Sequence, residues 1–394
     1  MRHDVTTGFV FARTFVAALL VTALVSQAHA ELFADDDKPA TTENFSDEIA
    51  RTVSAFKACE RRFYADLRRA GQDKEKVAQL NDDYNRDSGA IVAAFIASLE
   101  AHRADPAFLD GMVALVVDLS YPPPTELLEI VKRQYIASPK LARICPELGG
   151  RGDEQWSREL LEAIRDQSPH REARGRATYA LGEYYRHASL PFARQRPDAE
   201  IESSLVKARE FYNLALQEFA DVPADNGRTI GQQATLQIAR LDNLPNLKVG
   251  KPAPEIVGTD LDGRQMALSE TRGKVTVIVF WGTWCGPCMR MVPHERELLA
   301  RHKDKPFVIL GVNSGDDLKT AQATVEKHQM RWRHWWDGGA TRESPIQIAY
   351  NIQHWPTVFV LDKAGIIRSF DPRGEELDKV VDSLLAQEAT DQPE

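Results

Sequence analysis

Hydrophobic and polar positions follow two different periods along this chain. Between residues 44 and 245, apolar residues recur at spacings of three, four and seven, as at Ile49, Val53 and Phe56. That spacing places apolar side chains on one face of a helix. Breaks fall at Asp105-Pro106, Pro122-Pro123-Pro124, Gly149-Gly150 and Ser168-Pro169. The pattern therefore predicts an all-α domain made of helices of ordinary length.

The pattern changes after a Pro- and Gly-rich linker at residues 243–254 (NLPNLKVGKPAP). Continuous apolar runs at Val275–Trp281 and Phe307–Asn313 predict buried strands. Turn residues at 260–263 and 362–365 predict hairpins. Helical patterns follow at 289–301, 318–329 and 375–388. We expect residues 246–394 to form an α/β domain, with a parallel core, an antiparallel edge hairpin and flanking helices.

The first thirty residues have the three parts of a signal peptide. Arg2 and Arg13 supply positive charge, residues 15–25 form an apolar run, and Ala28-His29-Ala30 resembles a cleavage site. The alternative is an uncleaved membrane anchor, but this run is shorter than the ~20 residues that a span needs. We expect cleavage near Ala30, export to the periplasm or beyond, and no stable membrane span afterwards. Residues 31–43 are acidic and predict a disordered leader.

Composition excludes some partners. The 394 residues are 43% hydrophobic and 27% charged, which is ordinary for two or three globular domains. The formal net charge of −9, without a basic block, argues against nucleic acid as a partner.

The strongest chemical signal is Trp284-Cys285-Gly286-Pro287-Cys288, between a predicted strand and a predicted helix. This position puts Cys285 at a helix N-terminus, where free N–H groups and the helix dipole favour a thiolate. Thiolates attack disulfides, so the motif predicts thiol–disulfide chemistry. Two alternatives are half of a zinc site and a static disulfide. Zinc needs further ligands, and His294 is the only nearby candidate, so we expect no metal and no cofactor.

Two further cysteines, Cys59 and Cys145, lie in the helical region. An even pair in an exported chain suggests a structural disulfide. Buried free thiols are the alternative.

The helical region also contains a pattern like that of a tetratricopeptide repeat. Leu181-Gly182-Glu183-Tyr184-Tyr185 has the L-G-x-x-Y form of its first helix, and Ala208, Tyr212 and Ala215 have the spacing of its second. The connection is too long for a standard repeat. Two packed antiparallel helices are the simpler interpretation, and a peptide-binding repeat is the alternative.

Residues from about 248 to 390 resemble the thioredoxin-fold domain of TlpA/ResA-like thiol–disulfide oxidoreductases, the redoxins, here with an N-terminal helical extension. The matching segments are Val249-Gly250-Lys251-Pro252-Ala253-Pro254, Arg272-Gly273-Lys274, Phe280-Trp281-Gly282-Thr283-Trp284-Cys285-Gly286-Pro287-Cys288, Pro293, and Trp355-Pro356-Thr357-Val358-Phe359-Val360-Leu361-Asp362.

The resemblance implies a role for each site residue. Cys285 is the exposed attacking nucleophile, and Cys288 resolves the mixed disulfide. Pro356 is in the cis form, and the backbone of Trp355 pairs with an extended substrate segment. The remaining substrate-binding residues are Trp284, which shields one side of the site, Gly286 and Pro287.

The chain departs from the family at the proton acceptor. Many thioredoxins carry a buried acid in the strand before the motif, where this chain has Val279. His294 and Glu295 are nearby in sequence, but exposed positions on a helix are the simpler interpretation of both. The acceptor for Cys288 stays unassigned.

These observations favour an extracytoplasmic enzyme that reduces protein disulfides, with electrons from a membrane donor. Two alternatives remain. A thiol peroxidase of the peroxiredoxin type would carry a Thr three residues before the reactive cysteine, where this chain has Gly282. The second alternative is a binding module, in which the helical domain recruits a partner to the α/β domain of residues 246–394, the redox domain.

Overall fold

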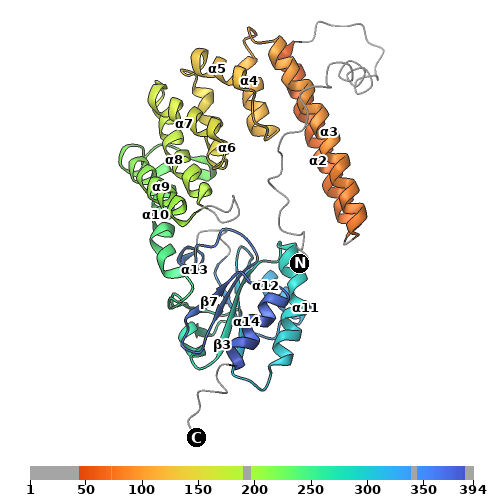
Figure 1. Cartoon of the computed structure of the whole chain (residues 1–394), viewed down its shortest axis with the longest axis vertical. Coiled ribbons are helices and arrows are strands. Elements are labelled where there is room, and N and C mark those ends of the chain that lie inside the picture. The colour runs from red at the N-terminus through yellow and green to blue at the C-terminus, as the bar shows by residue number, and fades with distance from the viewer. Residues whose placement is uncertain (1–43, 72, 190–196, 339–343, 387–394) are drawn as a thin grey trace. The chain divides into compact units, whose positions relative to one another are not determined.

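A computed structural model describes residues 44–71, 73–189, 197–338 and 344–386 (Figure 1). The chain divides into two compact units, Met1–Ser204 and Leu205–Glu394. The expected signal peptide and leader, residues 1–43, lie outside the described residues. Within the part of the chain that is described, no helix is both long and apolar enough to cross a membrane.

In the described part of the first unit, every regular element is a helix, as the spacing of apolar residues predicts. The elements are α2 (Phe45–Ala70), α3 (Lys74–Ala101), α4 (Phe108–Val113), η1 (Ala114–Asp118), α5 (Thr125–Gln134), η2 (Pro139–Arg143), α6 (Cys145–Gly149), α7 (Gln155–Gln167) and α8 (Arg171–Ala188). The proline and glycine breaks all fall between these elements or at their ends. Asn44 caps α2 by accepting a hydrogen bond from the N–H of Asp47.

The helix α9 (Asp198–Glu218) spans the division between the units. Ala208, Tyr212 and Ala215 are fully buried along it. Their burial agrees with the packing interpretation of the repeat-like pattern, because side chains inside a core are not open to a peptide.

The expected disulfide between Cys59 and Cys145 is wrong, because both are buried free thiols. Cys59 lies on α2, which packs mainly against α3, whereas Cys145 begins α6, which packs against α7 and α8. The thiol of Cys145 donates instead to the carbonyl oxygen of Leu141 at 3.3 Å. The two cysteines therefore belong to different local packing groups.

The second unit contains the α/β domain. Its elements after α9 are η3 (Asp225–Gly227), α10 (Ile230–Asn243), η4 (Leu244–Leu247), β1 (Val257–Thr259), β2 (Gln265–Ala267), η5 (Leu268–Thr271), β3 (Val275–Trp281), α11 (Gly286–Arg301), β4 (Phe307–Asn313), α12 (Leu318–His328), β5 (His334–Trp336), α13 (Pro345–Ala349), β6 (Thr357–Leu361), β7 (Ile367–Phe370) and α14 (Glu375–Ala386).

The main sheet has the strand order β5-β4-β3-β6-β7. β3 is parallel to β4, and β4 to β5, while β6 is antiparallel to β3 and β7. This is the predicted parallel core with an antiparallel hairpin at one edge. The separate β1–β2 hairpin also forms.

Both faces of the central strand β3 are covered, which explains why its sequence is apolar at every position except Thr276. Val277 and Val279 join an apolar cluster on one face, with side chains from α11 and α14. Ile278 and Phe280 join a second cluster on the other face, with side chains around α13. α11 and α14 lie on the same side of the sheet in Figure 1.

The division between the units lies earlier in the chain than the linker at residues 243–254. α10 is attached to the α/β domain: Arg240 donates to the carbonyl oxygen of Ile352 at 3.0 Å, and Asn243 to that of Ile348. Arg240 is buried, so its side chain is part of the domain's packing. The helix that looked like the end of the helical domain is therefore a component of the second unit.

Candidate active site

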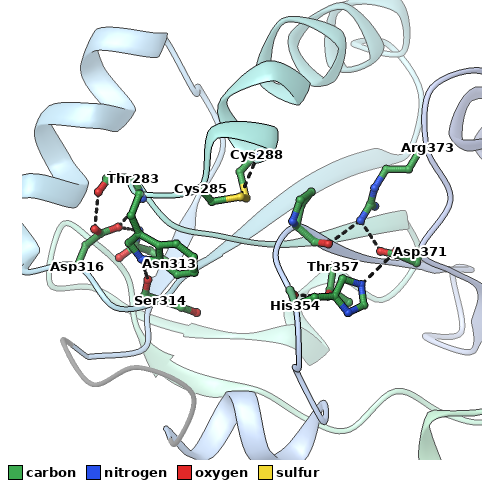
Figure 2. The surroundings of a disulfide bond; sticks show 12 residues. Thr283, Cys285, Cys288, Asn313, Ser314, Asp316, His354, Thr357, Asp371 and Arg373 are labelled. Carbon is green, nitrogen blue, oxygen red and sulfur yellow. Dashed lines mark hydrogen bonds and ion pairs between the residues drawn. A yellow bond between two sulfur atoms is a disulfide. The ribbon is translucent and has the colours of Figure 1, made fainter. Parts of the chain in front are cut away.

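The two motif cysteines lie where β3 ends and α11 begins, and they form a disulfide (Figure 2). Cys285 is the N-cap residue of α11. Its sulfur accepts a hydrogen bond from the backbone N–H of Cys288 at 3.1 Å. When the pair is reduced, that N–H and the positive end of the helix dipole stabilise a thiolate on Cys285. The placement of Cys285 at a helix N-terminus is thus confirmed.

The expectation that Cys285 is exposed is wrong in this disulfide form. Cys285 is 4% exposed and Cys288 is 2% exposed. Both sulfurs join the apolar cluster under α11, beside Trp281 and Val292. A partner thiol or disulfide must therefore approach over the residues at the surface of the motif.

Those surface residues are Trp284, Gly286 and Pro287, which are all exposed. The Trp284 ring is anchored at one end, because its Nε1 donates to the carbonyl oxygen of Ser314 at 3.1 Å. It meets the ring of Trp355 edge to face, with 5.1 Å between ring centroids. The two tryptophans thus lie together at the motif and leave half of the Trp284 residue open to solvent.

The peptide bond between Trp355 and Pro356 is cis, which confirms that expectation. The carbonyl oxygen of Pro356 accepts a hydrogen bond from Arg373 at 2.6 Å. Pro356 itself is buried, directly before β6. Figure 2 shows the segment around Thr357 facing the disulfide.

Arg373 belongs to a polar network that holds this proline segment and that sequence reasoning missed (Figure 2). Asp371 accepts hydrogen bonds from Arg373, from His354 and from the backbone N–H of Val358. Burial alone would raise the pKa of Asp371. The His354 hydrogen bond and the Arg373 charge outweigh it, so the pKa is lowered and the carboxylate stays ionised.

A second hydrogen-bond network, around Asp316, fixes the other side of the motif. Asp317 is the N-cap of α12, whereas the neighbouring Asp316 has a different role. Asp316 is buried and accepts hydrogen bonds from the N–H and the hydroxyl of Thr283 and from the Asn313 amide. It therefore ties the loop before Cys285 to the end of β4 (Figure 2).

The two neighbours considered as proton acceptors have different surroundings. His294 is paired with Asp378 of α14, at 2.9 Å. Glu295 is 2% exposed, so the expectation of an exposed helix position is wrong for this residue. Burial raises the pKa of Glu295 to about 8, and the Arg373 charge opposes that rise. The available signal was its position seven residues after Cys288, which places both on one face of the helix.

Comparisons with known proteins agree with this geometry. Residues 249–370 match the AhpC/TSA family. The chain is 38% identical over 120 residues to "Thiol-disulfide oxidoreductase ResA" from Geobacillus kaustophilus, which covers 30% of this chain and 67% of the relative. It is 28% identical over 148 residues to a protein of that name from Bacillus cereus, covering 38% of this chain and 76% of the relative.

A solved structure that is similar is the thioredoxin domain of a thiol-disulfide oxidoreductase from Bacteroides vulgatus. It is 26% identical, covers 35% of this chain and 99% of that domain, and has a TM-score of 0.34.

The strand order of the sheet and the Cys285–Cys288 pair at the start of α11 define an enzyme of the thioredoxin-fold class, a thiol–disulfide oxidoreductase. Within that class, the chain belongs to the ResA family.

Proposed function

We propose that this chain is an extracytoplasmic reductase of protein disulfides. The observation that carries the proposal is the N-cap position of Cys285, with its sulfur on the N–H of Cys288. That hydrogen bond and the helix dipole favour the thiolate that attacks a disulfide. The apolar run and the Ala28-His29-Ala30 sequence in the first thirty residues support export.

The reaction proceeds in two exchanges. The Cys285 thiolate attacks one sulfur of the substrate disulfide, forms a mixed disulfide and expels the other substrate sulfur as a thiolate. Cys288 then loses its proton and attacks Cys285, which re-forms the disulfide and releases the second substrate thiolate. Two electrons pass to the substrate, and a membrane electron donor restores the dithiol.

The substrate surface follows from the exposed motif. An extended segment of a disulfide-bearing protein lies over Trp284, Gly286 and Pro287, and it pairs with the backbone of Trp355 beside Pro356. Arg373 supports this arrangement because it holds the Pro356 carbonyl oxygen in place.

The alternative of a peroxidase is disfavoured by the packing at Gly282. A Cβ at this position would lie 2.6 Å from Trp284 Nε1 and 2.9 Å from the Ser314 carbonyl oxygen. A threonine, the residue that peroxiredoxins carry here, therefore requires the motif loop to move.

Insulin disulfide reduction tests the proposal. The mature chain should reduce insulin with dithiothreitol as the electron source, and Cys285→Ser should abolish the reaction. Reduced Cys288→Ser, freed of dithiothreitol and mixed with insulin, should instead accumulate a mixed disulfide that a non-reducing gel detects. Cys59→Ser and Cys145→Ser serve as matched controls and should keep full activity. Insulin reduction that survives Cys285→Ser would contradict the proposal.

Export is tested separately. Expression of the full chain with its first thirty residues should give an exported protein that begins at Glu31, as read by N-terminal sequencing. A chain retained in the membrane fraction with residues 1–30 attached would contradict this part of the proposal.

A further inference from the structure

Thiol–disulfide exchange moves a proton on Cys288 as well as electrons. Whenever the Cys285–Cys288 disulfide opens, the Cys288 sulfur leaves with an electron pair and takes up a proton. Whenever the disulfide closes, it gives that proton up. Cys288 is 2% exposed, so bulk water has poor access to it. A buried group on the protein is required for a fast transfer.

Glu295 is in position to be that group. Cys288, Val292 and Glu295 follow at i, i+4 and i+7, so they occupy one buried face of α11. About 10 Å of helix axis separates the Cα atoms of Cys288 and Glu295. Helical side chains lean towards the N-terminus of their helix, and the Glu295 side chain is longer than that of Cys288, so its carboxyl covers part of this separation. Proton transfer over the remaining distance requires a water molecule between the two groups.

One oxygen of the Glu295 carboxyl is without a hydrogen bond in the described part of the chain. This oxygen, Oε1, is buried. In a core, such an atom is costly, and structural carboxyls are normally paired. Val292 and Leu298, which flank Glu295 on this face, join the apolar cluster that also contains both motif cysteines.

The other titratable groups around α11 are accounted for. His294 and Arg301 both pair with Asp378 of α14. From the segment before α14, the Arg373 charge acts on Glu295, but its guanidinium donates to Pro356 and Asp371. The strands β3 and β6 contribute valines to the apolar cluster beneath α11, including Val279 and Val358.

We propose that Glu295 is the proton donor and acceptor of Cys288, an inference that rests on the proposed thiol–disulfide exchange. When an incoming thiolate bonds to Cys285, the Cys285–Cys288 bond breaks and its electron pair goes to the Cys288 sulfur. Glu295 gives its proton to that sulfur and becomes a carboxylate. When the disulfide re-forms, the carboxylate takes the proton back.

Burial supports a protonated Glu295 in the disulfide form, because it raises the pKa of this carboxyl to about 8. The proton is therefore present at neutral pH and is lost above pH 8. Above that pH, the Glu295 carboxylate has no proton to give, and its negative charge opposes the departure of the Cys288 sulfur as an anion.

The test follows the opening of the chain's own disulfide by dithiothreitol. The full oxidised chain is mixed with dithiothreitol from pH 5.5 to 9.5, and the rate constant is expressed per dithiothreitol thiolate. The wild-type rate constant should be level below pH 7 and fall as pH rises through about 8. Disulfide opening in Glu295→Gln should be about tenfold slower at pH 6, and its rate constant should not fall at higher pH. This loss is modest because a thiolate leaves readily even without an acid to protonate it.

Two further variants serve as controls for this test. Glu297→Gln changes an exposed acid on the same helix and should reproduce the wild-type profile. Glu295→Asp keeps an ionisable group and should keep a fall with pH, which separates proton transfer from packing. A Glu295→Gln profile that retains the wild-type fall would overturn the inference, as would the loss of the fall in Glu295→Asp.

This measurement is independent of the substrate. Failure to reduce insulin would contradict the proposed function but leave the profile measurable. A wild-type profile without a fall would remove the role of Glu295 and leave the proposed function standing.

Discussion

The chain holds two pairs of cysteines, one in each compact unit, and all four side chains are buried. Cys59 and Cys145 are free thiols inside the helical unit, whereas Cys285 and Cys288 form a disulfide in the redox domain. Burial therefore does not distinguish the pairs. The difference lies in the backbone. Cys285 is the N-cap of the sixteen-residue helix α11, and its sulfur accepts a hydrogen bond from the N–H of Cys288, whereas Cys59 lies inside α2.

The electrostatic surroundings of the cysteines follow this difference. Burial raises the pKa of the Cys59 thiol, and the charge of Arg62 reduces that effect only in part. At Cys285, the hydrogen bond and the helix dipole act to stabilise the thiolate. The reactive cysteine is therefore defined by the donors aimed at its sulfur, rather than by its degree of exposure.

The two pairs of cysteines should differ most in their reactivity in the reduced protein. At pH 7, iodoacetamide should alkylate Cys285 about a hundredfold faster than Cys59 or Cys145, because the thiolate is the reactive species. Mass spectrometry of peptides after timed quenching measures the three rates. Comparable rates at Cys59 and Cys285 would show that the helix N-terminus has no special effect here.

A second prediction concerns the buried acid beneath the reactive pair. In the folded chain, burial raises the pKa of the Glu295 carboxyl to about 8, whereas in the unfolded chain its pKa is 4.5. Unfolding therefore releases a proton between these values, and stability falls as pH rises through this window. Glu295→Gln should remove that loss and stabilise the redox domain by about 3 kcal/mol at pH 7.

Urea unfolding, followed by tryptophan fluorescence, checks this stability prediction at pH 5 and pH 7. The gain from Glu295→Gln should be small at pH 5 and grow towards pH 8. Glu297→Gln changes an exposed acid and serves as the control, because its effect on the free energy of unfolding should not grow with pH. A gain that stays constant with pH would mean that Glu295 does not change its ionisation on unfolding.

The smallest expected effect concerns the loop that positions Cys285. Asp316→Asn replaces an acceptor of three hydrogen bonds from Thr283 and Asn313, and should cost about 1–3 kcal/mol. The looser loop should also reduce the alkylation advantage of Cys285 severalfold. Asp317→Asn is the matched control, because asparagine caps a helix as well as aspartate does. Equal melting temperatures for the two variants would contradict the role of Asp316.

The sequence predicts the redox domain well because its signals are local. The run Val275–Trp281 is apolar at every position but one, and Cys285 follows it at the start of a helical pattern. The cis bond before Pro356 came from the family resemblance rather than from the residues alone. The strands, the helix and the position of the cysteines therefore follow from short segments.

The remaining features depend on contacts between distant segments. Asp316 lies 33 residues after Thr283 in the sequence, and only the fold brings the two together. Asp371 and Arg373 lie after β7, yet they support the proline segment before β6. Glu295 carried the one usable signal, its spacing from Cys288, but a single charged residue in a helix normally indicates an exposed position.

The helical unit shows the same limit. Its helices and breaks were predictable from periodicity, but the pairing of Cys59 and Cys145 was not, because an even number of cysteines carries no information about distance. α10 was assigned to this unit because it is helical, whereas the contacts of Arg240 and Asn243 join it to the redox domain.

The reduction potential of the Cys285–Cys288 pair decides whether it works as a reductant. The mature chain, with Cys59 and Cys145 replaced by serine, is equilibrated in thiol–disulfide buffers and the oxidised fraction is measured. The account predicts a value near that of thioredoxin, about −270 mV. A value near that of a strong oxidant, about −120 mV, would mean that the enzyme forms disulfides and would contradict the proposed direction.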